Sequence, residues 1–179
     1  MSVIYLLRIG DVEGRVLDEL RAGLSAEWPA RCKILPSVLD PEFAFHPERR
    51  QFHSTEILAR MRNLLQPDTW RLLGVTGVDL YIPILTFVFG EAQVGDACAV
   101  VSFHRLRQEF YGLPPDRELL RGRILKEAAH ELGHTMELTH CEDYRCVMAP
   151  SHAVEWIDLK GSALCDGCRA SLLATRRET

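Results

Sequence analysis

The sequence has no hydrophobic run long enough to cross a membrane and no long run of charges of one sign. A spanning helix needs about 20 predominantly apolar residues, and the apolar run near the N-terminus is much shorter and lacks the basic stretch of a signal peptide. The net charge is −4, and without a basic cluster nothing indicates binding to nucleic acid or to a membrane surface. We therefore expect a protein of the reducing cytoplasm, where cysteines seldom form structural disulfides.

Neither internal repeats nor low-complexity segments interrupt the chain, and its size predicts one domain. With 179 residues it can bury a substantial core. Its 47% hydrophobic and 26% charged residues are ordinary for a soluble globular protein. We expect residues 1–179 to form a single domain that acts as a monomer.

The first half of the chain alternates between strand-like and helix-like segments. The strands are expected at residues 2–10, 31–39, 71–83, 86–92 and 96–106. Helices are expected at 11–28 and at 54–65, the latter with Ser54 or Thr55 as its N-cap. Residues 40–53 show no period and are expected to form an exposed loop. We place the strand at 96–106 at a sheet edge, where an extended peptide could pair with it.

This order predicts an α/β fold in which helices pack on a mixed, twisted sheet. Right-handed crossovers should join parallel neighbours in the first half, and close spacing allows an antiparallel pair among the later strands. A long helix is expected at 116–136, with Asp116 as its N-cap. The α/β part would thus be 1–136, and the C-terminal part, 137–179, would be irregular until a short helix near 167–176.

Three of the seven histidines lie together in the stretch HELGHTMELTH, residues 130–140. Residues four apart on a helix are about 40° apart around the axis, so His130 and His134 can direct two imidazoles at one zinc ion. Glu131 lies about 100° round from His130, which suits a general base, and H-E-x-x-H carries this mechanism on a helix. His140 can join the site only if the helix ends just past His134, because a straight helix would place it about 15 Å beyond His130.

Four of the six cysteines form two close pairs after the histidines: Cys141, Cys146, Cys165 and Cys168. In a cytoplasmic chain this pattern favours a metal over a disulfide, and it matches a structural Cys₄ zinc site. Such a site would hold residues 141–165, which have few apolar residues of their own. The alternatives are free thiols or a redox C-x-x-C, but a redox motif belongs near an early βαβ unit.

The combined pattern H-E-x-x-H-x-x-x-x-x-H-C, followed by C-x-M and C-x-x-C, resembles the archaemetzincins, zinc-dependent metallopeptidases of the metzincin clan. The similarity runs from His130 to Cys168, and the upstream stretch DLYIPILTFVFGEAQVG is also similar to that family. The resemblance implies a metzincin-like fold and a Met-turn, at Met148, under the catalytic metal. It also implies a catalytic zinc and a second, structural zinc. The residues that correspond are His130, His134 and His140 for the catalytic zinc, Glu131 as general base, and Cys141, Cys146, Cys165 and Cys168 for the structural zinc.

One residue departs from the metzincin pattern, because Glu137 stands where the pattern has a glycine that lets the backbone turn out of the helix. A left-handed conformation costs a non-glycine residue roughly 1–2 kcal/mol, and zinc binding contributes much more. In the alternative, the helix runs on and Glu137 is the third ligand, but it would then lie about 10 Å from His130 along the axis. We expect the site with three histidines.

These residues predict hydrolysis of peptide bonds by an endo- or aminopeptidase with two Zn²⁺ per chain. Three neutral imidazoles leave one zinc position for a water whose pKa falls to about 7. Glu131 would take its proton, and the hydroxide would attack a peptide carbonyl of the substrate. The alternatives are a non-catalytic, zinc-containing peptide-binding protein of the same fold and a structural protein with one zinc. We expect Cys32 and Cys98 to be buried, inert thiols and the remaining histidines, His46, His53, His104 and His152, to have ordinary surface or polar roles.

Overall fold

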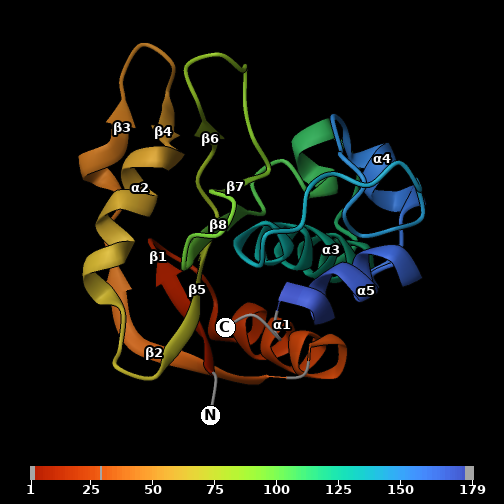
Figure 1. Ribbon diagram of the computed structural model, residues 1–179. Helices are drawn as coiled ribbons and strands as arrows, with labels where there is room; N and C mark the ends of the chain where they lie inside the picture. The colour runs from red at the N-terminus through yellow and green to blue at the C-terminus, as the bar shows by residue number, and fades with distance from the viewer. Residues whose placement is uncertain (1–2, 29, 176–179) are drawn as a thin grey trace.

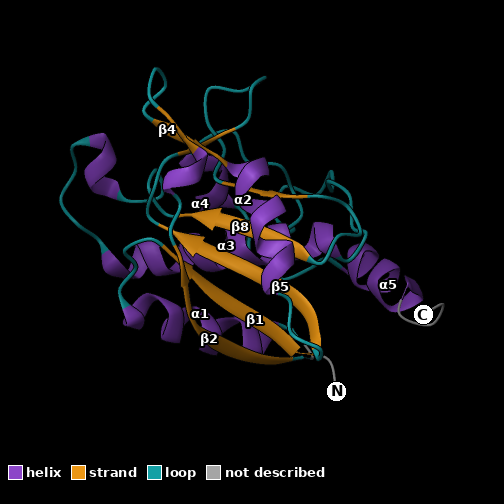
Figure 2. Ribbon diagram, turned by 90° about the vertical axis from the view of Figure 1, so that its left-hand side faces the viewer, coloured by secondary structure: helices purple, strands orange, loops and turns teal. Residues whose placement is uncertain are grey.

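The computed structural model describes residues 3–28 and 30–175, and its centre is a twisted five-stranded sheet in the order β2-β1-β5-β8-β7 (Figures 1 and 2). The strands are β1 (Val3–Ile9), β2 (Arg31–Leu39), β5 (Thr69–Thr76), β7 (Gly90–Ala92) and β8 (Cys98–Ser102). The first four strands in this order run parallel, and β7 pairs with β8 antiparallel. The predicted α/β fold with a mixed sheet is confirmed.

The position predicted for the strand at 96–106 is wrong, because β8 lies inside the sheet and β7 forms the edge. All five residues of β8 are buried, as an interior strand requires. The strands expected at 71–83 and 86–92 are also shorter. The first ends at Thr76, the last residue of β5. Of the second, only Gly90–Ala92 is a strand, and Val88 makes an isolated bridge with Leu80. Any pairing with an extended peptide at this side of the sheet would therefore involve β7.

A second, smaller sheet occupies part of the segment expected to be a loop. It consists of β3 (Phe45–His46), β4 (Gln51–His53) and β6 (Leu80–Tyr81), preceded by a 3₁₀ helix at Glu42–Ala44. The prediction of a loop at 40–53 is thus wrong in part. Strands of two or three residues show no period in the sequence, and long-range pairing with β6 is what orders them.

Helices cover both faces of the central sheet (Figure 2). The helices are α1 (Gly14–Glu27), α2 (Ser54–Met61), α3 (Arg117–Thr135), α4 (Val154–Leu159) and α5 (Asp166–Thr175), with further 3₁₀ helices at Arg62–Leu64 and Gln108–Tyr111. Strand residues alternate between two apolar clusters: Ile4 and Leu6 pack with α1 and α3, and Leu7 and Ile9 pack with α2. None of the helices among the described residues combines the length and the apolar character that a bilayer requires.

Two local predictions about helices are wrong. His53, and not Ser54 or Thr55, precedes the first turn of α2, because the Ser54 hydroxyl is buried and donates to the carbonyl oxygen of Tyr81 instead. Helix α4, only six residues long, was expected to be irregular. It forms because Val154 and Ile157 pack into the core that contains α3.

Helix α3, which carries the histidine motif, begins as predicted. The Asp116 side chain accepts a hydrogen bond of 2.9 Å from the backbone N–H of Leu119 and so caps the helix. The segment after α3 packs against the same core as the helix, through Val147, Met148 and Leu172 among others. The C-terminal third of the chain is therefore packed alongside α3, with α4 and α5 beside it (Figure 1).

Candidate active site

The chain turns back sharply where α3 ends, at Thr135. Glu137 has a φ of 67°, in the left-handed region. The N–H groups of Glu137 and Leu138 donate to the carbonyl oxygens of His134 and Gly133, both at 3.1 Å. The helix thus ends where a site with three histidines requires it to end, although the turn residue is not glycine. Glu137 is exposed and is not among the side chains whose ligand atoms converge, so the alternative with Glu137 as third ligand is not supported.

His130, His134 and His140 come together at this turn. Their ring centroids are 4.7 to 5.3 Å apart, and one nitrogen from each ring lies within 4.8 Å of the others. The Nε2 atoms of His130 and His134 are 3.1 Å apart. The structure therefore brings together all three histidines singled out in the sequence.

Hydrogen bonds orient two of these rings. Nδ1 of His130 lies 2.8 Å from the carbonyl oxygen of Val147, and Nδ1 of His134 lies 2.8 Å from that of Leu138. A carbonyl oxygen only accepts, so each Nδ1 must carry the hydrogen and each Nε2 keeps its lone pair. Those lone pairs are available at the point where the rings meet.

The surroundings of the three rings favour neutral imidazole. Burial is the main cause of the lowered pKa at all three, and it brings the pKa of His130 to about 3. The positive charge of Lys160 acts in the same direction on each of them. Neutral imidazole is the form that binds a metal, so the set is in its ligating state at neutral pH.

Glu131 is buried beside the three rings and lies against the edge strand β7. A Cβ atom added to Gly90 would be 2.7 Å from Cγ of Glu131, so this position needs glycine. Burial, and then the neighbouring charge of Glu127, raise the pKa of the Glu131 carboxyl well above its ordinary value. A carboxylate with a raised pKa is a stronger proton acceptor than an ordinary glutamate.

Met148 is fully buried under the turn, against α3. A Cβ atom on Gly133 would overlap the Met148 sulfur and lie 3.0 Å from its methyl carbon. The Met148 carbonyl oxygen accepts a hydrogen bond of 3.0 Å from the N–H of Cys141, the residue that follows His140. The segment with Met148 thus supports both the helix and the chain around the third histidine.

The four clustered cysteines also converge, with their sulfur atoms within 4.8 Å of one another. Sγ of Cys141 is 3.8 Å from Sγ of Cys165, and the N–H of Cys165 donates to Sγ of Cys146 at 3.3 Å. The backbone N–H of Cys168 is the main cause that lowers the pKa of the Cys165 thiol to about 7. The four cysteines thus form a group able to bind a metal, and it lies beside the histidines because Cys141 directly follows His140.

The other two cysteines have a different environment. Burial raises the pKa of Cys32 and Cys98 to about 11. Cys98 is fully buried in β8 and Cys32 is partly buried in β2. Both thiols stay protonated at neutral pH, as expected of inert cysteines, but burial was predicted for both and only Cys98 is fully buried.

A cavity of about 430 Å³ opens in front of the histidines, between residues 82–92 and residues 150–152. Sequence reasoning missed several residues of this region: Glu91, Glu127, His152 and Lys160. Of these, only Glu127 could have been identified from the sequence, because it precedes Glu131 by four residues and so lies on the same face of the helix. His152, expected to have an ordinary role, lines the cavity close enough for its charge to lower the pKa of His140, after burial and Lys160.

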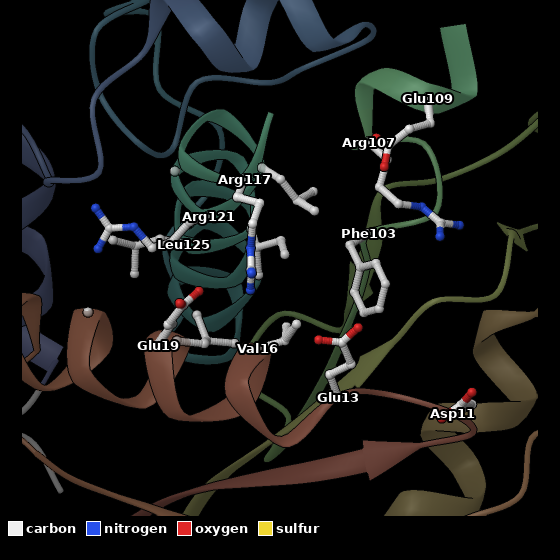
Figure 3. Close-up of a pocket in the computed structure, with 15 residues that line it drawn as sticks. Asp11, Glu13, Val16, Glu19, Phe103, Arg107, Glu109, Arg117, Arg121 and Leu125 are labelled. Atoms are coloured by element: carbon white, nitrogen blue, oxygen red, sulfur yellow. The ribbon is translucent and has the colours of Figure 1, made fainter. Parts of the chain in front are cut away.

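A larger cavity, of about 580 Å³, lies elsewhere, between α1 and α3 (Figure 3). Charged side chains surround it, among them Glu13 just before α1, Glu19 from α1, and Arg117 and Arg121 from α3. Neither the three histidines nor the four clustered cysteines line it. The chemistry described above therefore belongs to the smaller cavity.

Comparisons with known proteins agree with this arrangement. The model of Peptidase family M54 matches residues 38–174. The archaemetzincin of Methanocaldococcus jannaschii is 42% identical over 94% of this chain and 92% of its own, and that of Thermococcus kodakarensis is 44% identical over 97% and 96%.

Solved structures show the same relationship. The archaemetzincin from Archaeoglobus fulgidus, complexed with malonate, superposes with a TM-score of 0.81 at 37% identity, over 94% of this chain and 98% of that one. A zinc-dependent peptidase from Methanocorpusculum labreanum superposes with a TM-score of 0.80 at 31% identity, over 94% and 99%. The chain therefore belongs to peptidase family M54, the archaemetzincins.

Proposed function

We propose that this protein is a zinc-dependent peptidase, with zinc bound by His130, His134 and His140 and with Glu131 as general base. The observation that carries the proposal is the convergence of the three imidazoles on one point beside a buried carboxylate. The name of the Methanocorpusculum labreanum neighbour, a zinc-dependent peptidase, supports the choice of metal.

The donor set fits zinc. Two nitrogen ligands of a tetrahedral zinc ion lie about 3.3 Å apart when each bond is 2.0–2.1 Å, and the Nε2 atoms of His130 and His134 are 3.1 Å apart. Three neutral nitrogen donors are the set found in zinc sites that keep a fourth position open. That open position would face the cavity lined by all three histidines.

The chemistry that a bound zinc ion supplies is polarisation of the scissile carbonyl and greater acidity of a water molecule. The Glu131 carboxylate accepts the proton of the attacking water and delivers it to the nitrogen of the leaving amine. Because a nearby cation favours the ionised carboxyl, a bound metal would lower the raised pKa of Glu131 and keep its carboxylate available as a base. The Val147 and Leu138 carbonyls hold two imidazoles in place throughout.

We further propose that Cys141, Cys146, Cys165 and Cys168 hold a second zinc ion with a structural role. Sulfur ligands of a tetrahedral zinc ion with bonds of 2.3 Å lie about 3.8 Å apart, and the Cys141 and Cys165 sulfurs are 3.8 Å apart. Four thiolates leave no position open for a substrate. A cytoplasmic location, as expected from the sequence, would keep these thiols reduced and available for the metal.

The competing interpretation is a peptide-binding protein without catalysis, and the departure from the metzincin pattern at Glu137 is the sequence feature that favours it. Glu137 nevertheless adopts the left-handed conformation of the turn, and the three imidazoles meet as the site requires. No observation among the described residues favours this alternative over hydrolysis, so we retain hydrolysis as the proposal.

Two measurements test the proposed function. Metal analysis of the purified protein should find two zinc ions per chain. A peptide library, with free and with acetylated N-termini, should be cleaved, and a hydroxamate should inhibit the cleavage. If only free N-termini support cleavage, the enzyme is an aminopeptidase; if both do, it is an endopeptidase.

The role of Glu131 is tested by Glu131→Gln, which keeps the shape of the side chain and removes its basicity. Hydrolysis should collapse while the zinc content stays at two ions per chain. Undiminished turnover in this variant would reject Glu131 as the base. Absence of cleavage by the wild-type protein, with two zinc ions bound, would favour the peptide-binding alternative.

A further inference from the structure

A buried ion pair lies directly behind the candidate active site. The ammonium nitrogen of Lys160 is 2.8 Å from Oε1 of Glu127, and the two side chains are only 1% and 4% exposed. Lys160 also donates a hydrogen bond of 3.1 Å to the carbonyl oxygen of Ala149, the residue after Met148. One ammonium group thus contacts both the helix α3 and the segment that runs beneath its end.

Glu127 belongs to the wall of the active site. On α3 it precedes His130 by three residues and Glu131 by four, so the three side chains share one face of the helix. Glu127 also lines the cavity in which His130 and Glu131 lie. Lys160 is therefore the counter-charge of a carboxylate that would otherwise be buried and unpaired beside the reacting groups.

Stability alone does not account for this pair. Removing two charges from water offsets most of their mutual attraction, and a well-packed apolar pair of similar volume is often just as stable. An ammonium held between two oxygen atoms does something an apolar pair cannot, because it fixes the positions of both oxygens relative to each other. Here those oxygens belong to Glu127 and to Ala149.

We propose that Lys160 is a positioning residue of the active site, which holds the segment 147–149 against α3 and so keeps the His130 ring in line with the other two. The connection is short. Ala149 is two residues from Val147, whose carbonyl oxygen accepts the hydrogen bond from Nδ1 of His130. Movement of this segment would turn the imidazole, since the bond to Val147 sets its orientation.

The inference rests on the proposed function, and the test uses a double substitution, Glu127→Gln with Lys160→Met. A single substitution would leave one charge buried and unpaired and could unfold the protein, whereas the double variant is neutral and similar in volume. Lys126→Met is the matched control. Lys126 is adjacent on α3 and donates to the Ile157 carbonyl oxygen at 3.0 Å, but it does not line the active-site cavity.

The readout is the set of imidazole ¹⁵N signals in protein labelled at histidine, recorded without metal and during a zinc titration, together with the melting temperature. We expect the double variant to melt close to the wild type. Its His130 signal in the metal-free protein should shift, and the zinc affinity of the histidine site should fall by about tenfold or more, as for other residues that support metal ligands. Turnover should fall as well. Lys126→Met should match the wild type in every respect.

Two results would overturn the inference. One is a double variant with wild-type histidine signals and zinc affinity. The other is a loss of affinity that merely follows a large loss of melting temperature, which would give the pair a stabilising role only. A wild-type protein whose histidines bind no zinc would instead contradict the proposed function itself, so the two failures are distinguishable.

Discussion

Replacement of Gly90 by alanine should displace the Glu131 carboxylate while leaving the zinc ligands in place. A Cβ atom at position 90 would lie 2.7 Å from Cγ of Glu131 and 2.6 Å from the carbonyl oxygen of Val100. Restoring an ordinary contact of 3.5 Å requires the Glu131 side chain to move by roughly 0.8 Å. The Val100 backbone is held in the sheet between β5 and β7, so residue 90 in the edge strand must shift slightly away from Val100 while the Glu131 side chain moves away from the new methyl group.

The size of the effect follows from this displacement. A misplacement of 1 Å can cost about 100-fold in rate, so we expect kcat of Gly90→Ala to fall about 10- to 100-fold. Because the extra methyl group is forced into a packed site, the free energy of unfolding should fall by about 1–3 kcal/mol. The three atoms nearest to the added Cβ belong to Val100 and Glu131 and none of them to an imidazole, so we expect the zinc content to stay the same.

The assay compares kcat on one peptide, zinc content by mass spectrometry and the melting temperature for the wild type and two variants. Gly122→Ala is the control, because it lies on the same helix as Glu131 and a Cβ there meets no atom within 4 Å. Alanine in a helix should stabilise that variant by up to about 1 kcal/mol without changing kcat. A folded, zinc-loaded Gly90→Ala protein that turns over within about twofold of the wild type would refute the reasoning.

Three further predictions concern the metals and the supporting contacts. Cys165→Ser should lose one of the two zinc ions, and turnover should drop because His140 precedes the first ligand of that site; a variant with both ions and full activity would contradict this. Gly133→Ala should destabilise the protein by about 1–3 kcal/mol, because its Cβ overlaps Met148, and urea unfolding measures the loss. In the metal-free protein, the pKa of His130 is lowered from 6.5 to about 3. As the pH falls, His130 is therefore protonated in the unfolded chain before it is protonated in the folded one. The contribution of His130 to stability should therefore be complete above pH 6.5 and decline as the pH falls towards 3, so the difference in urea stability between the wild type and His130→Gln should be larger at pH 7 than at pH 5.

Long periodic segments of the fold could be predicted from the sequence, because their pattern arises within the segment itself. The repeat of apolar residues every four positions identified α1, and the cap at Asp116 marked the start of α3. Short elements could not be predicted in this way. The strands β3 and β6 have two residues each and exist through pairing with β4.

The interior position of β8 was also beyond local reasoning. Its run CAVVS fits an interior strand and an edge strand alike until its neighbours are known. The antiparallel partner is a strand of only three residues, Gly90–Ala92, which follows a long irregular stretch. Pairing between these segments, and not the sequence of either one, decided which of them forms the edge.

The sequence by itself determined the kinds of donor and their spacing: His130 and His134 on one helical face, Glu131 beside them, and two close pairs of cysteines. These are local properties, set by the helix repeat and by short intervals along the chain. Only the tertiary structure decided that His140 reaches the same point, that Gly90 closes on Glu131, and that Lys160 joins Glu127 to the segment under the helix. Each of these contacts joins segments that belong to different elements, so it depends on how the elements pack, and no short stretch of sequence contains that information.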